Sequence, residues 1–304
     1  MFENDRKKYR YYGSKNGSTN CWYLLLIVDF LATGMFYDLK KRRSLMYSKN
    51  YLSVKISHLN YQIKKLPYGR YGSYRGKEVI YIISSPSDPN ISWRNHRRYQ
   101  VNTKRGRKYS EEVTKSNLFR KELELVISEW DKNYKGTPPV LPVPIKRTKG
   151  KMNYDFFVAS EGEQNKEDSP EMIEYKGIKF RSKNEVIAAQ VLDKLNIEYK
   201  VEPKLILDGK LMFPDFIIGV QEVDKAAYVE IFGKMDDYEY VDTNAKRNAR
   251  YIRAGLRQGR DYIPFYTCNS KTFDVEAFEK QILAWLELAA EDIVAQAAEE
   301  GEKT

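Results

Sequence analysis

Two acidic residues stand inside apolar segments of the second half of the chain, and this placement constrains the fold more than any other feature. Asp215 follows Pro214 within the segment 211–219, and Glu230 lies within the segment 226–232. Both segments have the length and apolar content of buried strands. An ionised carboxylate is unstable in such surroundings without a partner. The fold must therefore bring these acids to a cation, a metal ion or hydrogen-bond donors.

The segments around these acids predict a mixed α/β domain. A helix is expected over 182–196, where Ser182 can cap the helix and Glu185 follows three residues later, as in a capping box. The other expected elements are strands over 199–207, 211–219 and 226–232, with a tight turn at Asp208-Gly209, then a helix over 237–256, a strand over 262–267 and a helix over 273–296. This order, α-β-β-β-α-β-α, predicts a mixed sheet flanked by helices.

The two strand acids are expected to converge. Glu230 follows Asp215 by 15 residues, on what the pattern indicates is the neighbouring strand of a hairpin. Carboxylates that converge at the end of a sheet offer hard oxygen ligands, which suit Mg²⁺ or Mn²⁺. A plainer interpretation treats the acids separately, with Glu185 as a helix-cap partner, Asp215 as a turn residue and Glu230 as an edge-strand charge.

The order of these residues resembles the PD-(D/E)xK nuclease superfamily, also called restriction-endonuclease-like, over about residues 171–290. In that family a helix bears Glu, one strand bears Pro-Asp, and the next bears Asp/Glu-x-Lys. The corresponding residues here are Glu185, Pro214-Asp215 and Glu230. The resemblance implies a restriction-endonuclease-like fold, catalytic and Mg²⁺- or Mn²⁺-binding roles for the three acids, and hydrolysis of phosphodiester bonds in DNA.

The family's lysine is missing from its usual place, because Phe232 stands two residues after Glu230. The stretch from Glu230 to Gly233, followed by a Tyr-bearing helix, resembles a variant in which a lysine of that helix replaces the strand lysine. Lys246 is the first choice for this catalytic role and Lys234 the second. Such a lysine would orient the attacking water or stabilise charge on the phosphate.

The first half of the chain is strongly basic and predicts an α+β module that binds a polyanion. Residues 1–150 hold 31 Lys and Arg against 12 Asp and Glu, a net charge of +19, whereas residues 151–304 carry −9. Lys and Arg neutralise phosphates, and the many neighbouring tyrosines can stack on bases. The candidate nucleic-acid contacts are Arg70, Arg75, Arg94, Arg97, Arg98, Lys104, Arg105, Arg107 and Lys108. A surface that recruits a partner protein remains an alternative.

Local patterns in this basic half predict a hairpin and a helix. Strands are expected over 51–66 and 77–83, joined by a glycine-rich loop over 67–76, and a helix over 109–131. Residues 136–150 hold four prolines, and residues 160–170 are polar and acidic. The expected domains are therefore a basic module over 1–135, a linker over 136–170 and the nuclease-like domain over 171–304.

Other classes of protein are disfavoured by what the chain lacks. Two cysteines, Cys21 and Cys268, exclude a disulfide framework and a Cys-rich zinc module. The apolar run 21–36 is short for a membrane span and has Asp29 in its middle, so it is expected to be core. These features predict a cytoplasmic protein without a membrane partner.

The sequence thus predicts a Mg²⁺- or Mn²⁺-dependent endodeoxyribonuclease. The superfamily that it resembles serves restriction, transposition, repair and phage-related functions, and its members often cut with a second copy or a partner protein. Phe232 motivates a different hypothesis, a nucleic-acid-binding protein without catalysis on a degenerate nuclease fold. A partner-recruiting scaffold that uses the basic half is the third hypothesis.

Overall fold

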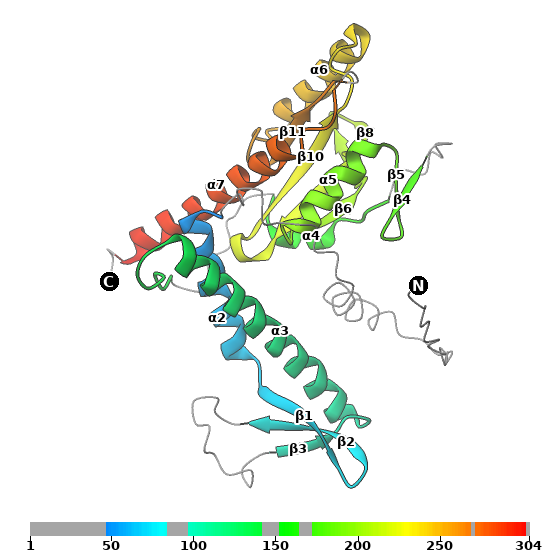
Figure 1. The fold of residues 1–304 in the computed structure, drawn as a ribbon. Coiled ribbons are helices and arrows are strands. Elements are labelled where there is room, and N and C mark those ends of the chain that lie inside the picture. Colours follow the sequence, from blue (N-terminus) through cyan, green and yellow to red (C-terminus); the bar gives the residue numbers. More distant parts are fainter. Residues whose placement is uncertain (1–46, 84–96, 142–151, 164–171, 269–270, 302–304) are drawn as a thin grey trace, which may run out of the picture. The chain divides into compact units, whose positions relative to one another are not determined.

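The computed structural model describes residues 47–83, 97–141, 152–163, 172–268 and 271–301, all within one compact unit, Met46–Thr304 (Figure 1). The described elements are α2 (Lys49–Lys65), β1 (Tyr68–Tyr74), β2 (Lys77–Ile83), β3 (Arg97–Gln100), α3 (Lys104–Asn133), α4 (Tyr154–Ala159), β4 (Ile173–Tyr175), β5 (Ile178–Phe180), α5 (Lys183–Lys194), β6 (Glu198–Val201), β7 (Leu205–Leu207), β8 (Lys210–Met212), β9 (Phe216–Val220), the 3-10 helix η3 (Gln221–Val223), β10 (Lys225–Phe232), α6 (Tyr238–Arg253), β11 (Tyr262–Tyr266) and α7 (Val275–Gly301). The chain is a mixed α/β protein.

A four-stranded mixed sheet, in the order β11-β10-β9-β6, forms the centre of the second half. Strand β10 pairs in parallel with β11 and antiparallel with β9. The predicted order of elements is confirmed in outline, but two predicted strands each divide in two. The small hairpin β7–β8 causes the division, because Asp208 and Gly209 take positive φ angles of 50° and 69° and turn the chain back.

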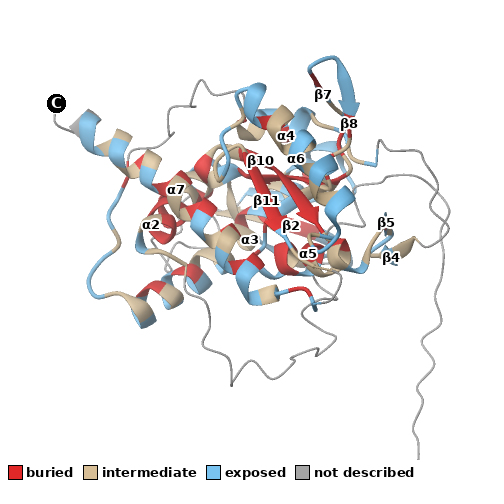
Figure 2. Ribbon diagram, turned by 90° about the horizontal axis from the view of Figure 1, so that it is seen from above, coloured by how far each residue is buried: buried red, intermediate tan, exposed pale blue. Residues whose placement is uncertain are grey.

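The side chains of β10 alternate between two hydrophobic cores. Val229 and Ile231 pack with residues of α5 and α7, whereas Tyr228 and Phe232 pack with residues of α4 and α6. The strand is buried along almost its whole length (Figure 2). Because successive side chains point to opposite faces, Glu230 shares the face of Tyr228 and Phe232 and is directed towards α6.

The predicted strand over 51–66 is wrong, because this segment forms the helix α2. The Ser48 side chain accepts a hydrogen bond from the backbone N–H of Tyr51 and caps the helix. Leu52, Ile56 and Leu59 then recur at helical spacing and pack against Val126 and Trp130 of α3. The alternation of apolar and polar residues that suggested a strand is thus part of the apolar face of a helix.

The predicted loop over 67–76 is also wrong, since most of it forms strand β1. The strand pairs antiparallel with β2 from Tyr68↔Ile83 to Tyr74↔Lys77, and the turn is only two residues long. The predicted strand over 77–83 is confirmed. The predicted helix over 109–131 is confirmed as part of α3, which begins earlier, after the cap Thr103.

Part of the predicted linker is packed structure. Phe157 of α4 is buried in the core between α4, α6 and the central sheet, and Leu141 belongs to the core that contains α5 and α7. The ring of Phe157 lies directly over Gly219 of β9. The division of the chain into functional domains stays a prediction.

Among the described residues, no helix has the length and apolarity needed to cross a membrane. The apolar run 21–36 lies outside the described residues.

We expect Gly219→Ala to destabilise the protein by about 1–3 kcal/mol, the usual effect of overpacking a core. A Cβ at this position would overlap the Phe157 ring. The free energy of unfolding in urea measures the loss. Gly233→Ala is the matched control, because its Cβ would meet only the Asn184 side chain, at 3.5 Å. Equal stability of the two variants would contradict the packing of α4 on β9.

Candidate functional site

Glu230 lies on an internal strand of the central sheet, so the interpretation of it as an edge-strand charge is wrong. Its side chain is only 3% exposed. Oε1 accepts hydrogen bonds from Arg247 Nε at 3.0 Å, from Arg247 Nη2 at 2.6 Å and from the hydroxyl of Tyr251. Burial raises the pKa of Glu230, while Arg247 and Tyr251 act in the opposite direction.

Asp215 lies one residue before β9, at the position that faces Glu230. The register pairs Phe216 with Val229, so Asp215 and Glu230 occupy the next position of each strand. Asp215 Oδ2 accepts a hydrogen bond from the backbone N–H of Ile231 at 2.6 Å. Burial raises the pKa of Asp215 well above its usual range, and the charges of Glu230 and Glu185 raise it further.

Glu185 forms the predicted capping box at the start of α5. Ser182 Oγ donates to Glu185 Oε1 at 2.8 Å, and the backbone N–H of Glu185 donates to Ser182 Oγ at 3.2 Å. The backbone N–H of Arg181 donates to Oε2 at 3.1 Å. The interpretation of Glu185 as a helix-cap partner is therefore confirmed. Its charge nevertheless raises the pKa of both Asp215 and Glu230.

Glu185, Asp215 and Glu230 together form what we call the acid cluster. The sequence prediction that all three meet closely enough to hold a metal ion stays a prediction. All three have raised pKa values, with burial as the largest cause. Repulsion between like charges adds to burial at Asp215 and, more weakly, at Glu230, where Arg247 opposes it.

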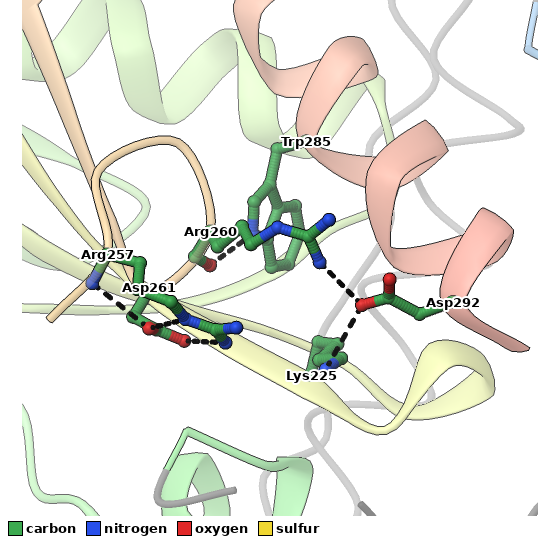
Figure 3. Close-up of polar contacts among 6 residues, drawn as sticks. All are labelled: Lys225, Arg257, Arg260, Asp261, Trp285 and Asp292. Carbon is green, nitrogen blue, oxygen red and sulfur yellow. Dashed lines mark hydrogen bonds and ion pairs between the residues drawn. The ribbon is translucent and has the colours of Figure 1, made fainter.

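In a second polar cluster, near the start of β11, each acid is paired with cations (Figure 3). Asp261 is paired with Arg257, and Asp292 is paired with Arg260 and Lys225. The hydrogen bonds from Arg257 lower the pKa of Asp261. These acids are matched by cations and hold α7 to the sheet, as structural ion pairs do. In the acid cluster only Glu230 has a cation of this kind, Arg247, among the ion pairs of the described residues.

Helix α6 directs one face towards the acid cluster. Tyr240, Arg247 and Tyr251 lie on this face, at spacings of seven and four residues. The Tyr240 hydroxyl accepts a hydrogen bond from the backbone N–H of Gly233 at 3.2 Å, and burial together with the charges of the strand acids raises the pKa of Tyr240. The ring of Tyr251 stacks on Tyr262 at 4.0 Å.

Arg247 is the functional candidate that the sequence prediction missed. Besides Glu230, its Nη2 donates to the carbonyl of Phe213 at 2.8 Å, so that it also holds the segment that precedes Asp215. The Glu230 carboxylate strongly favours the charged form and raises the pKa of Arg247. The spacing of four residues between Arg247 and Tyr251 was the available signal, since it places both on one helix face.

The structure does not bring the predicted lysines to the acid cluster. Lys246 Nζ lies 2.6 Å from Asp242 Oδ2, and these side chains are 70% and 69% exposed. Successive helix residues point about 100° apart, so Lys246 turns to solvent while Arg247 faces the sheet. Lys234 is exposed in the stretch between β10 and α6.

The acid cluster is not a preformed three-carboxylate metal site. Within the described ranges, no group of three or more His, Cys, Asp or Glu side chains is arranged to hold a metal ion. The donor chemistry fits a smaller site. Mg²⁺ is usually held by one or two carboxylates, with water and phosphate oxygens completing its shell. Asp215 and Glu230 are such a pair, although Oε1 of Glu230 already accepts from Arg247 and Tyr251.

The candidate nucleic-acid residues gather on one part of the fold. Arg70 and Arg75 lie on and beyond β1, Arg97 and Arg98 lie on β3, and four more cations begin α3, namely Lys104, Arg105, Arg107 and Lys108. All eight are exposed. Arg94 lies outside the described residues.

Comparisons with protein-family models, with curated proteins and with solved structures found no match. The geometry of this chain's own residues is therefore the basis for assigning a function.

In metal-free buffer, we expect the free energy of unfolding of the wild-type protein to fall relative to that of Asp215→Asn as pH rises from about 4. The pKa of Asp215 is raised in the folded state. The folded protein therefore keeps a proton that the unfolded chain, with a carboxyl pKa of about 3.9, has already lost. Asp215→Asn removes this titration. Urea denaturation of both proteins at a series of pH values should show this difference in slope, because the other carboxyl groups, among them Glu222 and Asp261 with lowered pKa values, are present in both. An unchanged slope would contradict the coupling.

Proposed function

We propose that this protein is a metal-dependent endonuclease with a restriction-endonuclease-like fold, which hydrolyses phosphodiester bonds in DNA. The observation that supports the proposal is the acid cluster itself. Asp215 and Glu230 stand opposite each other on paired strands, and the charge of Glu185 on α5 raises the pKa of both. Packing gains nothing from such like charge, and strongly perturbed carboxylates are typical of functional sites.

Asp215 and Glu230 are the residues that would hold the metal, with Glu185 adding negative charge from the end of α5. A bound Mg²⁺ or Mn²⁺ would neutralise charge on the phosphodiester and lower the pKa of a bound water. Both strand acids lie where backbone hydrogen bonds and α6 fix them, which keeps their separation constant.

Arg247 takes the role that the resemblance assigned to a helix lysine. Its guanidinium is held by Glu230 and by the carbonyl of Phe213, yet the side chain remains 32% exposed. N–H groups left at the exposed edge can donate to phosphate oxygens in the planar, bidentate manner that arginine favours. Arg247 thus orients Glu230 on one side and meets the substrate on the other.

A second candidate function is DNA binding without cleavage. Two observations favour it: Oε1 of Glu230 is already taken by Arg247 and Tyr251, and Phe232 stands in the place of the strand lysine. In this case Arg247 itself is the cation that the acids require. The two candidates therefore differ in whether a divalent ion binds beside Arg247.

Incubation with supercoiled plasmid separates these functions. We expect the wild-type protein to nick the plasmid with Mg²⁺ or Mn²⁺ and to be inactive with EDTA. Asp215→Asn should reduce the rate at least about 100-fold, the lower end of what a catalytic group contributes. Asp242→Asn is the matched control, since it makes the same substitution at an exposed carboxylate of α6. Binding without nicking by the wild-type protein would support the second candidate.

The same assay distinguishes the two basic residues of α6. We expect Arg247→Met to reduce nicking at least about tenfold, because it frees Glu230 and removes a donor to phosphate. Lys246→Met removes the same charge one residue away and should leave the rate within about twofold, since an exposed i,i+4 ion pair contributes little. Thermal unfolding of both variants shows whether a lower nicking rate results from a loss of folded protein. A rate that depends on Lys246 and not on Arg247 would reverse this assignment.

A further inference from the structure

Strands β1 and β2 form a two-stranded ribbon that the acid cluster does not use. The pairing runs without interruption to Tyr74↔Lys77, and the turn consists of Arg75 and Gly76, both with positive φ angles of 50° and 73°. Two consecutive left-handed residues close a hairpin tightly and continue its twist. Aromatic and cationic residues therefore flank the tip directly.

One face of this ribbon is defined by Arg70, Tyr74, Lys77, Tyr81 and Arg98, and we call it the ribbon face. Arg70, Tyr81 and Arg98 are partners in one row across three strands, and Tyr74 is paired with Lys77. Paired residues of an antiparallel sheet point to the same side.

The opposite face is occupied by packing against α3. The hydroxyl of Tyr71 donates to the carbonyl of Ser110 at 2.9 Å and lies 2.7 Å from the hydroxyl of Thr114. Tyr99 contacts the ring of Tyr109 with 4.5 Å between centroids. Figure 1 shows β1, β2 and β3 lying beside the first turns of α3. The ribbon face is thus directed away from the helix that supports the sheet.

Tyrosine rings hold the arginines of the ribbon in place. The guanidinium carbon of Arg98 lies 3.3 Å from the ring centroid of Tyr74, and that of Arg75 lies 5.3 Å from the same ring. Arg70 lies 5.8 Å from the ring of Tyr81. A stacked guanidinium keeps its N–H groups available at its edge. Because these long side chains are ordered beforehand, binding an anion costs less conformational entropy.

The charge around the ribbon face is almost all of one sign. The paired positions of this face hold Arg70, Lys77 and Arg98 and no acid, whereas Arg97 and the cations that begin α3 belong to the opposite side of the sheet. Glu78 is paired with Ser73 and belongs to the opposite face of the sheet. The first turn of α3 holds cations and no acid, although a helix dipole disfavours cations there. Such local conflict is typical of a surface shaped for a ligand.

We propose that the ribbon face binds the phosphate backbone of duplex DNA, with the tip at Arg75-Gly76 entering a groove. The major groove admits a two-stranded β-ribbon, and fixed guanidinium groups beside the tip can reach the phosphates along its edges. Contacts of this kind carry little sequence information, so the binding is sequence-independent. The choice of DNA as the partner rests on the proposed function, whereas the surface shares no residue with the acid cluster.

Fluorescence anisotropy with a labelled duplex oligonucleotide, in EDTA so that nothing is cut, tests this surface. We expect the double variant Arg75→Gln/Arg98→Gln to bind at least about tenfold more weakly and to lower the salt-dependence slope of binding by about 1.8, the value for two lost phosphate contacts. The matched control is Lys204→Gln/Lys210→Gln, which removes two exposed charges from the α/β layer. Equal losses in the two variants would overturn the proposal.

A charge-neutral variant tests the role of the tyrosine. Tyr74→Ala keeps every arginine and releases Arg75 and Arg98 from the ring, so we expect affinity to fall about 2- to 5-fold with an unchanged salt slope. Circular dichroism confirms that each variant is folded. Unchanged affinity, or tighter binding of the wild-type protein to a single strand of equal length than to the duplex, would overturn the proposal.

Asp215→Asn separates this proposal from the nuclease activity. The variant should bind the duplex as the wild-type protein does. Loss of nicking with intact binding concerns the acid cluster alone. Duplex binding that does not depend on Arg75 and Arg98, in a protein that nicks, refutes the ribbon face alone.

Discussion

The buried ion pair between Glu230 and Arg247 is the interaction on which the geometry of the candidate site depends. A carboxylate on an internal strand is unstable by several kcal/mol unless charge and hydrogen bonds compensate it. Arg247 and Tyr251 supply that compensation from two successive turns of α6. The pair therefore fixes the helix on the sheet. Because Arg247 also binds the carbonyl of Phe213, it fixes the segment that leads into Asp215.

Arg247 and Tyr251 stabilise the charge of Glu230, so Asp215 is the acid of the cluster whose charge is least stabilised. The hydrogen bond from Ile231 and the charge of Arg247 offset only part of the effect of burial and of repulsion from Glu230 and Glu185 on the pKa of Asp215. Asp261 and Asp292, by contrast, are each paired with an arginine, at 2.7 Å in both cases. A buried carboxyl group with a raised pKa, beside a carboxylate that is paired with an arginine, is the arrangement expected where a site must accept a proton or bind a cation.

The sequence predicted the helices and strands of the second half better than those of the first. Periodicity and a capping box located α5, β10 and their acids, because burial and local hydrogen bonding act there in the same direction. The error at Lys246 is one of helix phase: a shift of one residue, set by the Asp237 cap of α6, exchanges the solvent face for the sheet face. The wrong prediction of a loop over 67–76 has another cause, the glycines of β1. Gly69 and Gly72 are there because the backbone of β2 and the Tyr81 ring approach closely, and they do not mark a turn.

Helix α2 explains how the basic half is joined to the α/β layer. Tyr51 and Val54 belong to the core that contains α5 and α7, whereas Leu52 and Ile56 belong to the core shared with α3. Buried Lys55 pairs with Glu122 of α3 at 2.8 Å and with Glu222 of η3 at 3.5 Å, so one cation holds acids from both sides. A helix whose opposite faces complete two different cores cannot move without disrupting both. The ribbon is therefore attached to the α/β layer through packed side chains, and a charge change at Lys55 would act on both halves together.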